Sequence, residues 1–301
     1  MDTLALNFIV ESGPLEGGNL GLVGPLTCET CAIDGDCVGE RWTPVNDDEL
    51  AALVAIVAMG QASQAAYILE ELVSPEPAFS KQTLRQEAKI KLTVEEPASK
   101  PRKGYPQWQR DGFLFEVISW IAAKTTHGEA ALLKDPHVSA TSQGLDGLML
   151  QINADKDEVQ STTVFEDKCT DNPRATFLGK VIPAFKDRHA NVRSAEIIDA
   201  AATLLKTAGL KHKDAARLSA AVTDKAKRKY RAAFSLPSNF DTLEERQKLF
   251  ADYNRIEDIA SEQRIGASFI TSDEMRKWIA DLADKAIKYL DSLEDGESFD
   301  V

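Results

Sequence analysis

The sequence predicts an α/β fold in which a mixed central sheet is flanked by helices. From residue 105 onward, segments of helical periodicity alternate with short apolar runs, in the order helix, strand, strand, helices, strand, helix, strand. Of the 301 residues, 43% are apolar and 28% are charged, as in an ordinary globular protein. A chain of this length can bury a full core, either as one large domain or as two smaller ones.

No apolar run reaches the length of roughly 20 residues that a membrane-spanning helix needs. The longest run covers residues 50–59. No basic segment precedes the apolar residues after Met1, so a secretory signal is not expected. The sequence therefore favours a cytoplasmic protein without a membrane partner.

Residues 1–95 predict an N-terminal arm and a helical region. The first 45 residues are rich in Gly and Pro and predict an edge strand at 4–10 followed by irregular loop. Asn46 and the acidic residues after it are typical of a helix start, and we expect one helix from there to Val73. A second helix is predicted near residues 81–92.

The stretch 95–104 combines Pro, Gly and charged residues and is the best linker candidate. It would separate the helical region from a second domain at 105–293, which an acidic, disordered tail at 294–301 would follow. The elements expected in this second domain are a helix at 108–121, strands at 144–150 and 163–169, helices at 173–188, 194–208 and 214–229, a strand at 230–236, a helix at 242–259, a strand at 264–270 and a helix at 272–293. Pro183 is expected to bend or break its helix, and Gly209 to close the next one.

Two predicted strands carry charged residues that suit metal-assisted hydrolysis. The first contains Asp146, and the second contains Glu166-Asp167-Lys168. Strand alternation places Glu166 and Lys168 on one face and turns Asp167 away from them. If the two strands are neighbours, Asp146 reaches the same site.

Mg²⁺ (or Mn²⁺) prefers oxygen ligands and commonly uses one or two carboxylates, so Asp146 and Glu166 are the predicted metal ligands. Lys168 would position the attacking water or stabilise charge on the phosphoryl oxygens. The alternative is a solvated cross-strand charge pair, because a Glu-x-Lys triplet often arises by chance.

The pattern Asp146, then Glu166-Asp167-Lys168, resembles the motif of the PD-(D/E)XK nuclease superfamily, and the order of elements over 108–235 supports the resemblance. It implies a restriction-endonuclease-like core and Mg²⁺-dependent cleavage of DNA. Leu145 stands where the family name has Pro. In many members the helix before the first strand adds an acidic residue. Glu116 holds that place here, with Asp111 as a substitute, and the alternative is a Glu116 on the solvated face.

The net charge of −13 argues against a protein that coats nucleic acid by itself. Between residues 174 and 231, however, basic residues exceed acidic ones by nine, which indicates a DNA-facing side; solvated Lys and Arg on helices are the alternative. The acidic remainder and the absence of a phosphate-binding loop motif suggest a helicase or ATPase partner subunit. These features resemble effector subunits of prokaryotic anti-phage defence, such as the nuclease subunit of Hachiman-type systems or Cap4-like effectors.

The cysteines Cys28, Cys31 and Cys37 form a C-x₂-C-x₅-C cluster that resembles a zinc knuckle without its last ligand. Reduced, unliganded thiols are the alternative. Cys169 follows Lys168, and alternation places it in the packed face.

A second function class stays open beside the nuclease. A nuclease-like fold could serve as a non-catalytic scaffold that binds protein or nucleic acid, with Asp146 and Glu166 as surface charges. A third possibility is a restriction enzyme that recognises a specific DNA sequence by itself.

Overall fold

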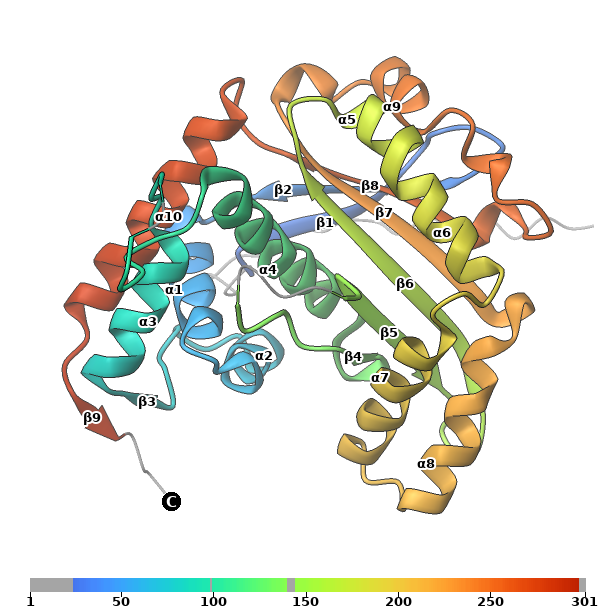
Figure 1. Ribbon diagram of the computed structural model, residues 1–301, viewed down its shortest axis with the longest axis horizontal. Helices are drawn as coiled ribbons and strands as arrows, with labels where there is room; N and C mark the ends of the chain where they lie inside the picture. Colours follow the sequence, from blue (N-terminus) through green and yellow to red (C-terminus); the bar gives the residue numbers. More distant parts are fainter. Residues whose placement is uncertain (1–23, 98, 140–143, 298–301) are drawn as a thin grey trace, which may run out of the picture.

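The computed structural model describes residues 24–97, 99–139 and 144–297, and these form one seven-stranded sheet in the order β1-β2-β8-β7-β6-β5-β4 (Figure 1). The strands are β1 (Leu26–Cys31), β2 (Val38–Pro44), β4 (Leu132–Leu133), β5 (Gly147–Ile152), β6 (Val159–Cys169), β7 (Arg228–Leu236) and β8 (Arg264–Ile270). Neighbours from β2 to β6 run parallel, while β1, β5 and β4 pair antiparallel. The predicted mixed sheet is confirmed.

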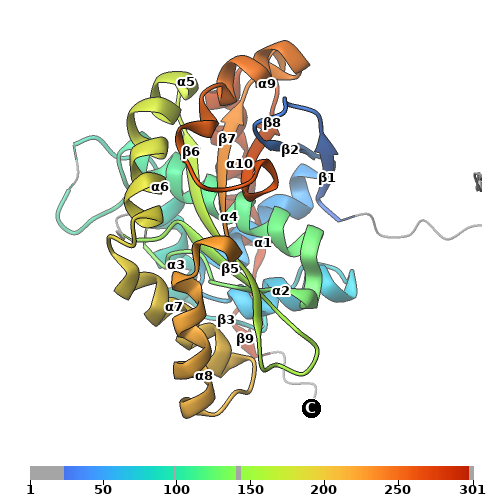
Figure 2. The same cartoon turned by 90° about the vertical axis from the view of Figure 1, so that its right-hand side faces the viewer.

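Helices cover both faces of the sheet, as the turned view in Figure 2 shows with α5 and α6 on one side. The first face packs against α1 (Asp47–Ala58), α2 (Ala62–Glu71), α3 (Gln82–Leu92), α4 (Gln107–His127) and α10 (Met275–Ser292). The second face packs against α5 (Pro173–Thr176), the π turn η2 (Phe177–Val181), α6 (Ile182–His189), α7 (Ser194–Thr207), α8 (His212–Ser219) and α9 (Leu243–Phe250). No helix in these described ranges is long and apolar enough to cross a membrane.

Alternation along β6 decides which side chains meet which helices. Phe165 belongs to the core under α4, whereas Val164 belongs to the core under α5–α8. Glu166 and Lys168 follow Val164 on the second face, and Asp167 follows Phe165 on the first.

The N-terminal region differs from the prediction in two respects. The single helix expected up to Val73 is two helices, because Gly60 adopts φ +85° between α1 and α2. The irregular loop expected before residue 45 contains β1 and β2. The strand expected at 4–10 lies outside the described residues.

The linker candidate 95–104 does not separate two cores. Residues of α1–α3 share one core with α4 and α10, and β1 and β2 belong to the same sheet as β5–β8. The segment is a loop closed at its base, where the N–H of Tyr105 donates to Thr93 O and the N–H of Glu95 to Tyr105 O, both at 2.9 Å. The predicted division into 1–95 and 105–293 is therefore not visible in the packing.

Several C-terminal elements are shorter than expected. The helix predicted at 214–229 ends at Ser219, and residues 228 and 229, which the prediction placed in this helix, belong to β7. The helix predicted to end at residue 259 ends at Phe250. The π turn η2 ends at Val181, two residues before Pro183, in line with a bend there.

The acidic tail is not wholly disordered. Gly296–Glu297 form β9, which pairs with β3 (Phe79–Ser80). Asp295 also lies 2.8 Å from Arg85. Residues 298–301 lie outside the described part of the chain.

Candidate active site

Asp146, Glu166 and Lys168 meet where β5 and β6 pair. The strands are antiparallel with Gly147 opposite Phe165, as the sequence predicted for neighbouring strands. Lys168 Nζ donates to Asp146 Oδ2 at 2.6 Å and lies 2.8 Å from Glu166 Oε2. Two carboxylates from adjacent strands thus converge on one ammonium group.

Gly147 allows this close pairing. A Cβ atom at this position would lie 2.4 Å from the Phe165 ring, so a larger residue would push the strands or the ring away. Just before it, Asp146 Oδ2 also accepts the backbone N–H of Asp167 at 2.9 Å. The glycine and this hydrogen bond together fix the carboxylate beside β6.

Glu166 is buried and has a second cationic neighbour. Its side chain is 9% exposed, and its Oε1 accepts from Arg188 of α6, which is 4% exposed. Arg188 belongs to the basic segment that the sequence predicts to face DNA, but in the structure Arg188 is an internal partner of the site. No local signal distinguishes it from exposed basic residues of the same segment.

The charge of Lys168 is held by its neighbours. Burial lowers the pKa of its ammonium group, but the carboxylates of Asp146 and Glu166 outweigh burial and raise it well above the usual range. Lys168 is therefore a permanent cation and hydrogen-bond donor in this arrangement.

Glu116 lies on α4 and is engaged by a histidine. Its Oε1 accepts the backbone N–H of His137 at 2.7 Å, and its Oε2 lies 3.1 Å from His137 Nδ1. The loop around His137 carries no motif, so the sequence pattern does not single this histidine out. The carboxylate orients the imidazole ring and leaves Nε2 on the other side.

Two cavities adjoin Lys168. One, of about 470 Å³, is lined by Glu116, His137, Asp146 and Lys168. The other, of about 400 Å³, is lined by Asp146, Glu166, Lys168 and Arg188. Asp146 and Lys168 line both cavities and therefore lie between them. Glu116 lines the first cavity and Glu166 the second, and no contact between these two residues is described.

Asp167 lies on the opposite face, as alternation predicts, but it meets protein rather than solvent. Its side chain is 3% exposed, and its Oδ1 lies 3.6 Å from Nη2 of the buried Arg231. The guanidinium carbon of Arg231 is 3.4 Å from the centroid of the Phe165 ring, and the group donates to Ser119. Burial raises the pKa of Asp167 to about 7, although Arg231 opposes the shift.

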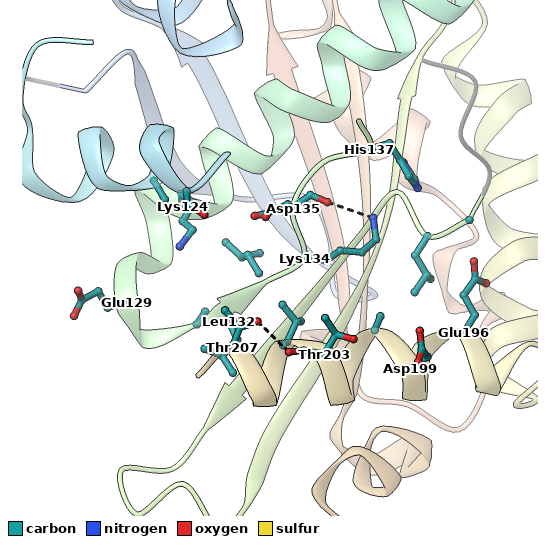
Figure 3. Close-up of a pocket in the computed structure, with 18 of the residues that line it drawn as sticks. Lys124, Glu129, Leu132, Lys134, Asp135, His137, Glu196, Asp199, Thr203 and Thr207 are labelled. Atoms are coloured by element: carbon teal, nitrogen blue, oxygen red, sulfur yellow. Dashed lines mark hydrogen bonds between the residues drawn. The ribbon is translucent and has the colours of Figure 1, made fainter. Parts of the chain in front are cut away.

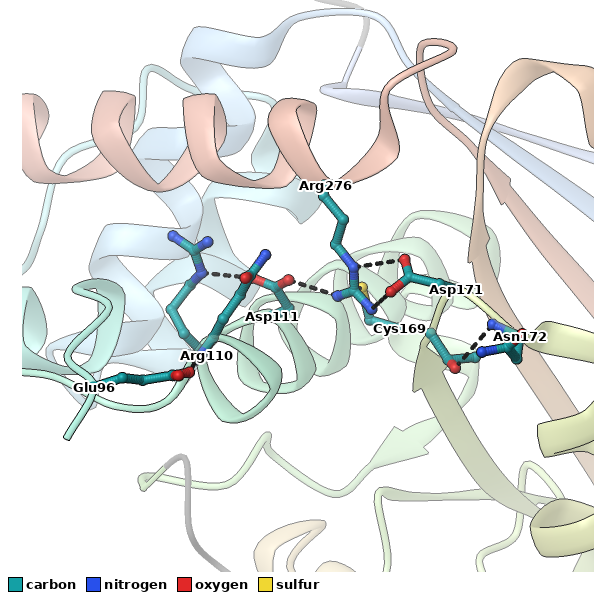
Figure 4. Close-up of polar contacts among 9 residues, drawn as sticks. Glu96, Arg110, Asp111, Cys169, Asp171, Asn172 and Arg276 are labelled. Carbon is teal, nitrogen blue, oxygen red and sulfur yellow. Dashed lines mark hydrogen bonds and ion pairs between the residues drawn. The ribbon is translucent and has the colours of Figure 1, made fainter. Parts of the chain in front are cut away.

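Asp111, the predicted substitute for Glu116, is committed to two arginines (Figure 4). Arg110 Nε and Arg276 Nη1 each donate to it at 2.6 Å, and the carboxylate is fully buried. Arg276 also donates to Asp171 at 2.8 Å and to Cys169 Sγ at 3.3 Å. This network ties α4 and α10 to the end of β6.

Cys169 packs against the core under α4, as predicted. Burial raises the pKa of its thiol to about 12. The group is therefore a neutral thiol at physiological pH.

The predicted zinc cluster is not assembled. Cys28 packs against the core on the α4 side, whereas Cys37 belongs to the core on the other side of the sheet. Burial raises the pKa of the Cys28 thiol to about 11 and of the Cys37 thiol to about 12, and it also raises the pKa of Cys31. Within the described ranges, no three His, Cys, Asp or Glu side chains gather as a metal site.

A larger cavity, of about 770 Å³, lies between α7 and the segment around β4 (Figure 3). It touches the smaller ones only through His137 and Gly144. Its walls carry Glu196 and Asp199 of α7 and, opposite them, Lys134, whose Nζ donates to Asp135 O at 3.3 Å. None of the predicted catalytic residues lines it.

The basic segment is only partly a surface. Arg188, Arg228 and Arg231 are buried, and Lys227 donates to Glu158 at 2.6 Å. The exposed basic residues of the segment are Lys180, Lys186, Arg193, Lys206, Lys211, Lys213, Arg217 and Lys225.

No family model and no curated protein matches this chain.

Proposed function

We propose that the protein is a metal-dependent endonuclease that hydrolyses DNA phosphodiester bonds beside Lys168. The observation that carries the proposal is the convergence of Asp146 and Glu166 on Lys168 Nζ, at 2.6 and 2.8 Å. The sequence resemblance to the PD-(D/E)XK superfamily supports it. The placement of α4, β5, β6 and β7 is compatible with the restriction-endonuclease-like core that the resemblance implies.

The donor set suits Mg²⁺ or Mn²⁺, because two carboxylates from adjacent strands face an accessible cavity. Asp146 and Glu166 would hold the ion. Each carboxylate has about four acceptor directions, so the contacts with Lys168, Arg188 and the Asp167 N–H leave acceptor capacity on both Asp146 and Glu166. A bound ion would polarise the phosphate and lower the pKa of a coordinated water.

Lys168 supplies positive charge rather than a base. As a permanent ammonium group it can donate hydrogen bonds to the phosphoryl oxygens, where negative charge develops during hydrolysis. Arg188 fixes the orientation of Glu166. Glu116 keeps its auxiliary place and acts through the orientation of His137.

A partner subunit fits the charge distribution. The chain carries a net charge of −13, and part of its basic segment is buried, so its own electrostatic attraction for DNA is small. A helicase or ATPase subunit would deliver the nucleic acid, as in the prokaryotic anti-phage defence complexes that the sequence resembles.

A non-catalytic scaffold is the second candidate. The observation in its favour is that Asp146, Glu166, Lys168 and Arg188 are linked in one ion-pair cluster. Such a cluster could hold β5, β6 and α6 together without any chemistry.

Purified protein incubated with plasmid DNA and Mg²⁺, with EDTA in a parallel reaction, separates the two candidates. We expect EDTA-sensitive cleavage by the wild type and by Glu158→Gln, which breaks an exposed ion pair near the start of β6. Glu166→Gln keeps the shape of the site and should be inactive. Cleavage by Glu166→Gln at the wild-type rate, or no cleavage by the wild type, would favour the scaffold. A ladder of discrete fragments would indicate intrinsic sequence recognition.

A further inference from the structure

One face of α4 lines the cavity of about 470 Å³ beside Lys168. This face carries an exposed indole ring and, next to it, a gap where a side chain is missing. Trp108, Gly112 and Glu116 recur every fourth residue and all line this cavity. Trp108 is 68% exposed, the highest value, together with Val138, among the large exposed apolar residues of the described chain. The helix thus carries an aromatic ring at the rim and a carboxylate deeper in the cavity.

Gly112 leaves the space between them open. No heavy atom lies within 4 Å of the position that a Cβ atom would take there. A glycine inside a helix destabilises the helix relative to alanine, and here nothing in the packing requires it. The open face between Trp108 and Glu116 can therefore receive a flat group.

The same cavity offers one uncommitted cation. Lys180 of η2 is exposed, and no residue in the described ranges forms an ion pair with it. Arg276 also lines the cavity, but its guanidinium group is held by Asp111 and Asp171. An aromatic face, an open gap and a free ammonium group together match the base and the phosphate of a nucleotide.

We propose that Trp108 and Gly112 form a notch that binds an unstacked base, and that single-stranded DNA is the preferred substrate of the site. In a duplex each base is covered by its neighbours, so an indole on a helix has no free base face to contact. An unpaired strand offers such a face at every position. This inference names the substrate class of the proposed nuclease and rests on that function only for the cleavage step.

Binding measured without catalysis tests the notch separately. Fluorescence anisotropy in EDTA would compare a labelled single-stranded oligonucleotide with the matching blunt hairpin, using the full chain. Trp108→Ala should weaken single-strand binding by about 5- to 100-fold, the usual effect of removing one stacking aromatic residue. Trp108→Tyr should retain most of the affinity. Tyr67→Ala, which removes another half-exposed aromatic residue outside the cavity, should bind like the wild type.

A second pair of variants fills the gap without removing the indole. Gly112→Leu should weaken single-strand binding strongly, and Gly112→Ala, which adds one carbon atom, should weaken it far less. Circular dichroism of both variants should show wild-type helix content, because the position faces open space.

The outcomes separate the two proposals. Wild-type affinity in Trp108→Ala, equal losses on single strand and hairpin, or no single-strand binding by the wild type would overturn the notch, whether or not plasmid is cut. If the variants lose single-strand binding and the wild type does not cleave with Mg²⁺, the notch stands and the nuclease proposal fails.

Discussion

Lys168 and Asp146 are 22 residues apart in sequence, yet Nζ of the lysine donates to Oδ2 of the aspartate at 2.6 Å. The contact exists because Gly147 lets the Phe165 ring lie against β5, which brings the end of β6 beside Asp146. Since both residues line both cavities at the site, their ion pair is the element that a substrate phosphate would meet from either side.

The first prediction concerns this ammonium group. Lys168→Met keeps most of the side-chain volume but removes the charge, and we expect a loss of cleavage of about 10²–10³-fold, as for other removed donors to a developing anion. Lys168→Arg should retain part of the activity. Initial rates on plasmid at saturating Mg²⁺ measure both, and a Lys168→Met variant with unchanged rates would exclude the assigned role.

The second prediction concerns Glu166 and Arg188. The sequence alone suggests that Glu166→Ala leaves folding intact, because the side chain points into a site. The structure shows a buried pair, and loss of one partner leaves the other charge unpaired at a cost of roughly 3–5 kcal/mol. We expect Glu166→Ala and Arg188→Met each to lower the free energy of unfolding in urea by about this amount.

The double variant Glu166→Gln, Arg188→Met should recover part of that loss, because neither buried charge remains. A double-mutant cycle built from Glu166→Gln, Arg188→Met and their combination measures the coupling. Strictly additive changes would mean that the two residues do not stabilise each other. For tests of catalysis, Glu166→Gln is therefore the better variant.

The third prediction is a pH dependence of stability. Burial raises the pKa of Asp167 to about 7 in the folded chain, above the ordinary value of 3.8 that applies when the chain is unfolded. Between these values the folded state binds a proton that the unfolded state has lost, so this residue makes stability fall as pH rises from about 4 to about 7. Asp167→Asn carries no such proton and should lack this contribution.

Urea unfolding of both proteins at several pH values between 4.5 and 8 would measure it. The difference in unfolding free energy, wild type minus Asp167→Asn, should decrease with pH over this range. A difference that increases with pH would show that the Arg231 charge dominates over burial. Because Asp167 points away from the site, its replacement should not affect the chemistry, and the asparagine variant tests this best, since alanine would leave Arg231 without its carboxylate partner.

The elements predicted correctly are those whose signal lies within a few residues. The alternation around Val164, Glu166 and Lys168 assigned β6 and its faces, because period-two geometry needs no tertiary information. The missed strands β1 and β2 have mixed burial along their length and gain their structure from pairing, since β2 pairs with β8 and β1 pairs with β2. Local propensity does not report such pairing.

The same limit applies to the site. Asp146 and Glu166 were predicted to converge, but the burial of Arg188 and Arg231 depends on which helix covers which face of the sheet. The local sequence around a basic residue on a helix is no different whether its side chain faces solvent or a buried carboxylate. The cysteines show the converse. Cys28 and Cys37 are close in sequence, but they pack on opposite sides of the sheet.

Charge reversal at Lys227 in the basic segment and truncation of the acidic tail after Leu293 are poor tests of DNA binding. Lys227 is tied to Glu158 and to Val159 O, so its reversal would disturb the β5–β6 hairpin. Truncation after Leu293 would remove Asp295, which pairs with Arg85, as well as β9. Both changes would alter stability together with charge.

The fourth prediction therefore uses exposed positions. Lys186 is an exposed residue of α6, the helix that carries Ala184 and Arg188 of the site, whereas Lys213 lies on α8, from which no residue lines the site. We expect Lys186→Glu to weaken binding of single-stranded DNA and to lower the slope of log affinity against log salt by about one, because one phosphate contact contributes roughly that much. Lys213→Glu should have a smaller effect at low salt that vanishes above about 0.1 M, where exposed charges more than about 10 Å apart are screened. Anisotropy titrations from 25 to 300 mM KCl would measure both slopes, and equal slopes for the two variants and the wild type would remove α6 as the DNA-facing surface and leave DNA recognition to a partner subunit.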